Sequence, residues 1–253
     1  MAEVVLEGRG LHFTAGGSPL VHGVSTALAR GAVLGIIGPN GAGKSTLVKL
    51  LIGQLSPASG GVTLMGRPLP DWPRRERAAL IGHLPQHFEP HWDYRVDELL
   101  RLGLDRAGRN APGLEALAGH FGLGAILKRH WSTLSGGERA RALAAAVLAP
   151  DPPVVLADEP AAALDVGQAA SLMARLRRLA DGGAAVAVVV HDLNLAARWC
   201  DRLLLMESGR AVIEADPAEV LQSPELDRVF ATRFQRIPLP DGGMVLAPGE
   251  STG

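Results

Sequence analysis

The stretch GPNGAGKST, Gly38 to Thr46, decides the fold of this chain. It fits the pattern G-x-x-x-x-G-K-[ST], in which a glycine-rich loop turns backbone N–H groups toward a chain of phosphates. The short apolar run 32–37 before the loop indicates a buried strand, and the run 47–52 after it indicates a helix. Strand, glycine loop and helix form the context that the motif requires, so the chain is predicted to bind a nucleoside triphosphate.

The residues of this loop have separate expected roles. Lys44 can reach the β- and γ-phosphates, and the Ser45 hydroxyl can ligate Mg²⁺. The glycines leave room for the phosphates, and the N-terminus of the following helix adds partial positive charge. A glycine turn that happens to precede a lysine is the alternative, and the matching flanks weigh against it. The predicted phosphate-binding residues are Gly38, Pro39, Asn40, Gly41, Ala42, Gly43, Lys44, Ser45 and Thr46.

The composition is that of an ordinary globular protein. The 253 residues are 47% apolar and 20% charged, with a net charge of −1. This balance allows a sizeable core and gives no strong field for nucleic acid or an anionic membrane. A single cysteine, Cys200, excludes an internal disulfide. We expect no signal peptide, because the N-terminus has no basic start followed by an apolar core. We also expect no membrane span, because no apolar run reaches about 18 residues.

Strand-like and helix-like segments alternate along most of the chain, which predicts an α/β fold. Residues 4–28 hold two strand-like runs around a glycine-rich turn at 15–19, which indicates a hairpin or a meander. Residues 94–149 have a helical pattern and are interpreted as a helical insertion. Continuous apolar strands with helices between them indicate a mostly parallel sheet. From Arg233 onward, prolines and glycines predict a loose tail.

Side chains at the ends of three predicted strands are expected to complete the phosphate site. The apolar run 154–157 places Asp158 at a strand end, where a carboxylate can hold Mg²⁺. Glu159 follows directly and is placed to polarise an attacking water, as general base or as its orienter. At the same edge, His191 is placed to contact a γ-phosphate. The Gln86 amide there can ligate Mg²⁺ or sense the γ-phosphate.

A second loop of phosphate-binding type, Leu134-Ser135-Gly136-Gly137-Glu138, opens a predicted helix. Ser135 can cap that helix, and the two glycines expose backbone N–H groups. One nucleotide hardly needs two such helix N-termini in one chain. The sequence therefore predicts a dimer, in which each nucleotide lies between the glycine loop of one copy and the Ser-Gly-Gly loop of the other.

Together these motifs resemble the ATP-binding cassette (ABC) ATPases, over about residues 3–230. The matching motifs are Walker A at Gly38–Thr46, the Q-loop at Gln86, the LSGGE signature at Leu134–Glu138, Walker B at Val154–Asp158 with the catalytic glutamate Glu159, the D-loop at Ala163–Asp165 and the switch histidine His191. Phe13 is similar to the aromatic residue that stacks on adenine, although tyrosine is commoner there. Ala140, Ala146 and Ala161 depart from the usual residues, and none of the three removes a catalytic group.

The resemblance implies a fold, a reaction and an assembly. The expected fold is a P-loop NTPase with a RecA-like core, an N-terminal antiparallel β-subdomain and an inserted α-helical subdomain at about 88–150. The ATPase domain is expected to span residues 1–232, with a C-terminal tail at 233–253. Two copies are expected to close head to tail over two Mg-ATP. In each site, Lys44, Glu159 and His191 would be catalytic, and Phe13, Gln86, Ser135, Gly136, Gly137 and Asp165 would contact the nucleotide.

A narrower resemblance concerns the transported cargo. The stretch His191 to Leu203 is similar to ATPases of bacterial importers for iron chelates, either siderophores or haem, and for cobalamin. The same similarity extends to Gly209-Arg210, Val96–Gly103 and Pro217–Leu221. This resemblance implies a separate integral-membrane permease, an indirect link to a substrate-binding protein, and a place at the cytoplasmic face of the bacterial inner membrane.

Other classes of function fit the sequence less well. A different ABC importer, for example one for metal ions, remains open. A non-transport ABC ATPase usually has a long coiled coil or two cassettes, and this chain has one set of motifs and no heptad run. A GTPase should carry an N-K-x-D motif, which is missing, and a small kinase has no use for the signature loop. Three histidines with helical spacing, His83, His87 and His91, would suit zinc, but Pro85 and Pro90 interrupt any such helix.

Three aromatic residues, Phe88, Trp92 and Tyr94, follow the Q-loop. In ABC ATPases this region faces the membrane-spanning subunits. An exposed apolar patch here would be a docking surface. Burial under the helical subdomain is the alternative, and the sequence leaves both open.

A substitution in the signature loop tests the predicted dimer. Ser135→Arg should place a bulky cation where the partner's nucleotide would lie, so ATP should no longer drive dimerisation. Size-exclusion chromatography with and without ATP measures this. If the variant still dimerised with ATP, the shared site would be wrong.

Overall fold

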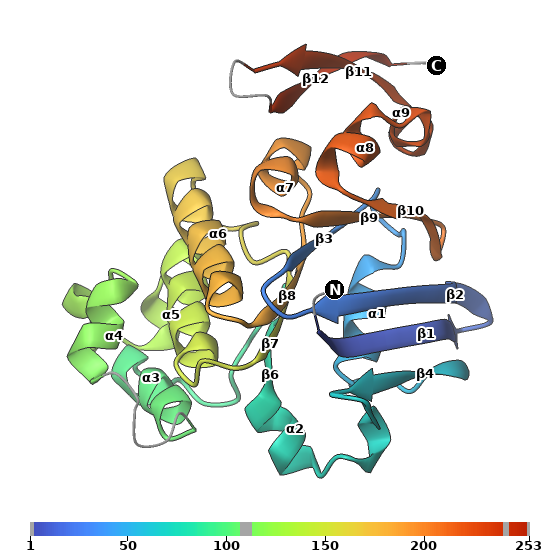
Figure 1. Ribbon diagram of the computed structural model, residues 1–253. Helices are drawn as coiled ribbons and strands as arrows, with labels where there is room; N and C mark the ends of the chain where they lie inside the picture. The colour runs from blue at the N-terminus through green and yellow to red at the C-terminus, as the bar shows by residue number, and fades with distance from the viewer. Residues whose placement is uncertain (1–2, 107–112, 240–242, 252–253) are drawn as a thin grey trace.

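A six-stranded sheet with the strand order β10-β9-β3-β8-β7-β6 forms the centre of the computed structural model, which describes residues 3–106, 113–239 and 243–251 (Figure 1). Its strands are β3 (Val33–Ile37), β6 (Ile81–Leu84), β7 (Val154–Asp158), β8 (Ala185–Val189), β9 (Arg202–Glu207) and β10 (Arg210–Ala215). All neighbouring pairs are parallel except β10 with β9. The predicted mostly parallel sheet is therefore confirmed.

The central strands are buried on both faces, which explains why they are continuously apolar. In β7, Val155 and Ala157 belong to one core cluster, and Val154 and Leu156 belong to the other. The first cluster lies under α5 (Gly136–Leu148), α6 (Val166–Asp181) and α7 (Leu193–Trp199). The second lies under α1 (Lys44–Leu51) and the N-terminal strands. Polar side chains of this sheet can therefore reach a ligand only at the strand ends.

The N-terminal part forms the expected antiparallel subdomain. Its strands β1 (Val4–Ala15), β2 (Ser18–Ala29), β4 (Ser59–Leu64) and β5 (Arg67–Pro68) form a sheet of order β2-β1-β4-β5. Of the two predicted arrangements, a hairpin or a meander, strands β1 and β2 form a hairpin. Gly16 and Gly17, with φ of 56° and 79°, form its turn, because glycine adopts positive φ without strain. A short 3₁₀ turn, Leu69–Asp71, and α2 (Arg74–Leu80) then lead to β6.

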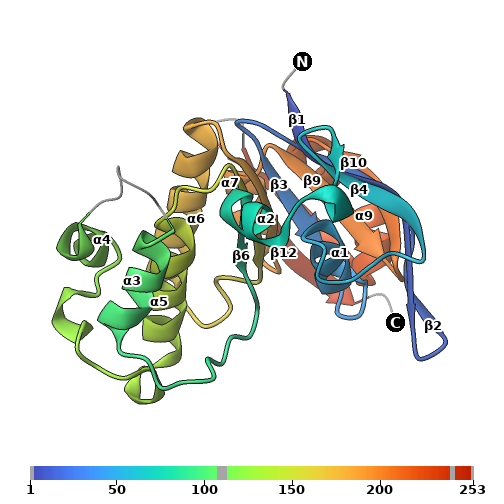
Figure 2. The same cartoon turned by 90° about the horizontal axis from the view of Figure 1, so that it is seen from below.

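A helical subdomain interrupts the β/α alternation, as predicted. It contains α3 (Val96–Leu104), α4 (Leu114–His120), the 3₁₀ turns Gly124–Ile126 and Trp131–Thr133, and α5. Figure 2 shows it as a separate lobe beside the sheet. Helices α3 and α5 approach closely at Gly103, where a Cβ would collide with the backbone of Ala146. The small residues of the alanine-rich α5 permit this approach.

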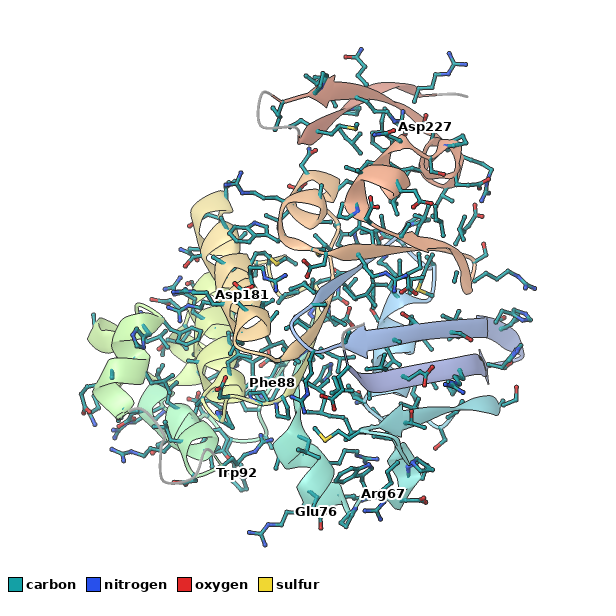
Figure 3. All side chains as sticks on the ribbon, viewed as in Figure 1. Arg67, Glu76, Phe88, Trp92, Asp181 and Asp227 are labelled. Carbon is teal, nitrogen blue, oxygen red and sulfur yellow. The ribbon has the colours of Figure 1, made fainter. Side chains whose placement is uncertain are left out.

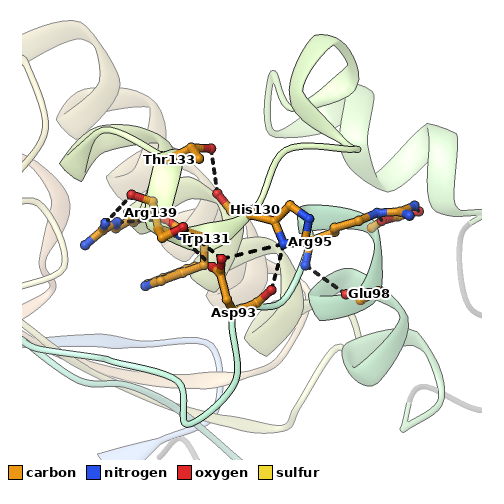
Figure 4. A network of polar contacts seen from close by, with 9 residues as sticks. Asp93, Arg95, Glu98, His130, Trp131, Thr133 and Arg139 are labelled. Atoms are coloured by element: carbon orange, nitrogen blue, oxygen red, sulfur yellow. Dashed lines mark hydrogen bonds and ion pairs between the residues drawn. The ribbon is translucent and has the colours of Figure 1, made fainter.

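Polar contacts fix the loop that leads into α5 (Figure 4). The backbone carbonyl of Asp93 lies 2.9 Å from His130 Nδ1, and the Asp93 carboxylate accepts hydrogen bonds from Ser132. Arg139 Nε donates to the Trp131 carbonyl at 3.1 Å. The start of α5 is thereby held against the segment that precedes α3.

The aromatic residues after β6 differ in their exposure to solvent. Phe88 packs edge-on against the buried Trp131, with 5.5 Å between ring centroids. Tyr94 is half-buried against the same core. Trp92 is 73% exposed and points away from the lobe (Figure 3). Burial therefore holds for Phe88 and Tyr94, and an exposed apolar side chain remains only at Trp92.

The C-terminal segment differs from the predicted loose tail. After α8 (Pro217–Gln222) and α9 (Pro224–Phe230), strands β11 (Thr232–Pro238) and β12 (Met244–Ser251) form an antiparallel pair. Half-buried and exposed residues alternate along β11, as expected for a strand with one covered face. The prediction was wrong because Pro238 and Pro248 were read as loop signals, whereas one ends β11 and the other lies in β12. Residues 240–242 and 252–253 of the predicted tail lie outside the described residues.

No helix within the described ranges is long and apolar enough to cross a membrane.

Asp97 of α3 is a buried carboxylate held by two cations. Its side chain is 5% exposed and accepts hydrogen bonds from Arg95 (3.0 and 2.7 Å) and from Lys128 (2.8 Å). Burial alone would raise the pKa of Asp97. The hydrogen bonds and the two positive charges outweigh burial and lower this pKa to about 2.

The lowered pKa of Asp97 predicts a pH-dependent stability. Because its pKa is lower in the folded state, the ionised carboxylate stabilises the protein above the ordinary value of 3.8 and loses this effect as pH falls toward 2. Asp97→Asn should therefore cost about 1–2 kcal/mol of unfolding free energy at pH 7, since it weakens charge-assisted hydrogen bonds. Urea unfolding from pH 7 to pH 2.5 measures this difference, which should shrink below about pH 4.

Glu3→Gln, which alters an exposed ion pair with Arg30, is the matched control and should show no such loss. An Asp97→Asn effect of the same size at pH 2.5 and pH 7 would contradict the charge-based account.

Candidate nucleotide-binding site

The glycine loop lies between β3 and α1, and its backbone requires glycine at two points. Gly43, the residue before α1, has φ of 94°, and Gly38 has φ of 145°. A Cβ at Gly43 would collide with the carbonyl oxygen of Leu20, and a Cβ at Gly38 with that of Met206. The loop is therefore packed from behind by β2 and β9, with its N–H groups at the start of α1.

The glycine loop is also supported by two backbone contacts of Gly209, which the sequence did not predict. Gly209 N donates to the Ala42 carbonyl at 3.0 Å, and His22 N donates to the Gly209 carbonyl at 2.7 Å. Gly209 lies in the turn between β9 and β10. In the sequence this turn looks like any other hairpin turn, so no local signal could have assigned it to the site.

Lys44 is the buried cation of the site. Lys44 is 5% exposed. Its Nζ donates hydrogen bonds to the carbonyl oxygens of Gly38 (2.7 Å) and Pro39 (2.9 Å). Burial lowers the pKa of Lys44, while the carboxylates of Glu159 and Asp158 oppose that change. These two carboxylates come from the adjacent end of β7, so the predicted grouping of Lys44 with them is present.

Asp158 and Ser45 form a pair of oxygen donors. Ser45 Oγ donates to Asp158 Oδ1 at 3.1 Å, and Asp158 is 3% exposed. Burial and the neighbouring Glu159 raise the pKa of Asp158, and the hydrogen bond from Ser45 opposes this. A buried carboxylate beside a hydroxyl suits a hard cation such as Mg²⁺, which prefers oxygen ligands and keeps several waters. This donor set therefore fits the predicted metal.

Glu159 lies between Gln86 and His191, which come from the ends of β6 and β8. Gln86 Nε2 donates to Glu159 Oε2 at 2.6 Å, and His191 Nε2 lies 2.6 Å from Glu159 Oε1. Three side chains that are far apart in the sequence thus meet at one edge of the sheet. Gln86 contacts Glu159 rather than the Ser45–Asp158 pair, so its assignment as a metal ligand stays a prediction.

The backbone of Glu159 is in the left-handed region, with φ of 51°. This conformation is unfavourable for a residue with a Cβ. It occurs where β7 ends and the chain turns into the D-loop, directly after Asp158. Such conformations cluster at functional sites, where the surrounding structure holds them.

The signature loop caps α5 as the sequence predicted. Glu138 N donates to Ser135 Oγ at 3.3 Å, and Ser135 N donates to Glu138 Oε2 at 2.8 Å, which is a capping box. Ser135 and Gly136 are exposed, and Gly137 is half-buried. Gly136 also lines a cavity of about 380 Å³ with Gln86 and Glu159. Contact of this loop with the nucleotide of a second copy stays a prediction.

Two further predicted contact residues have structural partners within the chain. Asp165 caps α6, accepting a hydrogen bond from Gln168 N at 2.8 Å. Phe13 is half-buried in β1 opposite Val21 and packs on the core beneath the β-subdomain. Their contacts with a nucleotide also stay predictions.

The histidine cluster considered for zinc has no matching geometry. His83 lies in β6, where burial lowers its pKa. Across residues 3–106, 113–239 and 243–251, no group of three or more His, Cys, Asp or Glu side chains is placed to hold a metal ion.

Comparison with known proteins identifies the family. The family model described as ABC transporter matches residues 21–162, from β2 through the signature loop and Walker B, and ends just before the D-loop. The chain belongs to the ABC transporter family. Its ATP-binding cassette therefore has the predicted fold, with the glycine loop and the signature loop that the sequence indicated.

The cassette has similar relatives over nearly its whole length. It is 41% identical over 235 residues to the hemin import ATP-binding protein HmuV of Pseudomonas putida, covering 89% of this chain and 92% of the relative. It is 38% identical over 250 residues to the protein of the same name in Streptomyces coelicolor, covering 96% and 89%.

Solved structures show the same fold. The ATP-binding subunit of an ABC transporter matches with a TM-score of 0.78 at 25% identity, covering 89% of this chain and 98% of that one. A putative metal-chelate type ABC transporter in an inward-facing conformation matches with a TM-score of 0.79 at 23% identity, covering 99% of each chain.

Substitution of Glu159 tests the hydrolytic site. Glu159→Gln keeps the size of the side chain but cannot accept a proton, so ATP hydrolysis should fall by about 100-fold or more. ATP binding should be unchanged, because Lys44 and the glycine loop are untouched. Steady-state hydrolysis and equilibrium titration with ATP measure the two effects separately.

Glu207→Gln is the matched control, because Glu207 ends β9 of the same sheet but pairs with Arg228 instead of the site. Turnover like the wild type in Glu159→Gln would remove Glu159 from the reaction.

Proposed function

We propose that this cassette hydrolyses ATP to energise haem uptake through a separate membrane permease. The observation that carries the proposal is the similarity to import ATP-binding proteins. Eight relatives named for hemin import are 35–41% identical to this chain, and the aligned region covers 87% or more of each relative. The edge of the sheet supports the ATPase part, because it holds the glycine loop, Asp158, Glu159 and His191 together.

Some residues at this edge bind the nucleotide, and others take part in its hydrolysis. Lys44 binds the β- and γ-phosphates and neutralises the charge that develops on the γ-phosphate. Ser45 and Asp158 would hold Mg²⁺, which when bound supplies further positive charge next to the phosphates. Glu159 orients a water for in-line attack. His191 contacts the γ-phosphate and holds the Glu159 carboxylate by the 2.6 Å contact.

A second copy of the chain completes the site. In this arrangement Ser135, Gly136 and Gly137 of one copy cover the nucleotide bound by the other. The exposure of Ser135 and Gly136 supports this arrangement, since these N–H groups at the start of α5 are open to an incoming phosphate. A similar cassette, 25% identical with a TM-score of 0.76, is dimeric in a post-hydrolysis state bound to ADP and Pi.

A membrane permease is the partner to which closure is transmitted. Gln86 joins the end of β6 to the helical subdomain and contacts Glu159, so it links the reacting edge to that lobe. Trp92, on the same connection, offers an exposed apolar side chain for docking. Closing and reopening of the dimer would then switch the permease between two states, with the cassette at the cytoplasmic face of the bacterial inner membrane.

Haem is the cargo that the relatives favour among the predicted iron chelates. Siderophores and cobalamin remain the alternatives within the same group of importers. The cassette itself contacts the permease rather than the cargo, so the choice among the three has to be tested in cells.

Deletion of the gene in its bacterial host tests both parts of the proposal. Growth with haem as the only iron source should be lost, and growth on an inorganic iron salt should be kept. The wild-type gene should restore growth on haem, Glu159→Gln should not, and Glu207→Gln should. Undiminished growth on haem would contradict the cargo assignment. A loss confined to a ferric siderophore, or to cobalamin-dependent growth, would move the cassette to that alternative.

A further inference from the structure

Asn194, the second residue of α7, is held from two sides. Its backbone N–H donates to Asp192 Oδ1 at 2.8 Å, and Asp192 directly follows His191. Its side-chain Nδ2 donates to the carbonyl oxygen of Leu246 at 3.0 Å, while Oδ1 accepts from Leu246 N at 2.7 Å. A single amide therefore pairs with both backbone groups of one residue in β12, in the way that a neighbouring strand would.

The hairpin that carries Leu246 is fixed independently on its other strand. Arg236 of β11 donates to both carboxylate oxygens of Asp227 in α9, at 3.0 and 3.1 Å. It also donates to the Leu221 carbonyl of α8 at 2.7 Å. Leu246 is 5% exposed and belongs to the core cluster beneath α7. Figure 1 shows the hairpin lying across α7, α8 and α9, so it is a firm point of attachment for Asn194.

The start of α7 needs such an attachment. Helix α7 has seven residues, and a helix of this length is not stable without tertiary contacts. His191 precedes it in a loop, and its side chain is 46% exposed, so little packing surrounds the imidazole. The position of His191 is therefore set mainly by its backbone, between the end of β8 and the start of α7.

We infer that Asn194 is a positioning residue for ATP hydrolysis, which ties the start of α7 to the C-terminal hairpin and thereby holds His191 against Glu159. This inference rests on the hydrolytic site proposed above. It also gives the C-terminal hairpin a part in the reaction, through the backbone of Leu246.

The chemistry of the amide explains why asparagine occupies this position. An aspartate could accept from Leu246 N but could not donate to the Leu246 carbonyl, and alanine could do neither. Aspartate would at the same time add a negative charge at the N-terminus of α7, which favours the helix. The two replacements therefore separate the tie to the hairpin from the stability of the helix.

Steady-state ATP hydrolysis by the full chain tests the inference. Asn194→Ala should lower kcat about tenfold, with the KM for ATP within about twofold of wild type, because the glycine loop is untouched. Asn194→Asp should give a kcat between the two, since it keeps one of the two hydrogen bonds. Arg198→Ala, an exposed change on the same helix outside this network, is the matched control and should match wild type. Thermal denaturation of each variant verifies that it is folded.

A second background decides whether Asn194 acts through His191. In His191→Ala, adding Asn194→Ala should cause no further loss of kcat. An equal loss in both backgrounds, or a wild-type kcat for Asn194→Ala, would overturn the inference and leave the hydrolytic site intact. Wild-type activity of His191→Ala itself would instead contradict the proposed role of His191, so the two failures are distinguishable.

Discussion

Burial of both faces of the central sheet is the constraint on which the rest of the structure depends. Successive residues of β7 alternate between two separate apolar cores, so neither face can accept a charged group. Charged side chains of these strands can therefore lie only where the strands end. Because β3, β6, β7 and β8 are parallel, they end at the same edge and bring their terminal residues together. The location of the site thus follows from the burial of both faces of the sheet.

The electrostatics of this edge follow from partial burial of opposite charges. Burial lowers the pKa of Lys44 and raises that of Asp158, so both groups are displaced toward their neutral forms. Buried charges without a full set of partners are costly, and phosphate oxygens and a divalent cation would supply the missing partners. Glu159, one residue further, instead has contacts with an amide and an imidazole. Adjacent carboxylates thereby acquire different environments.

The sequence predicted most of this site because its motifs are local. The glycine loop, the strand before Asp158 and the cap at Ser135 each depend on a few consecutive residues, whose spacing carries the geometry. The contacts of Gly209 behind the loop, and of Asn194 with Leu246, depend instead on segments that only the fold brings together. Residues 232–251 show the converse case. Prolines and glycines suggested a loop, but apolar contacts such as that of Phe234 with Phe230, at 6.0 Å between ring centroids, favour the hairpin.

The left-handed backbone of Glu159 creates a conflict between the stability of the fold and the activity of the site at a single position. Glycine would adopt φ of 51° without the steric cost that a Cβ carries, which is about 1–2 kcal/mol. A mutational screen of this cassette that selected only for resistance to heat would therefore favour loss of this carboxylate, for which we propose a role in orienting water. Variants of this cassette selected for thermal stability therefore have to be selected for ATP turnover as well, because the most stable of them could otherwise lack ATPase activity.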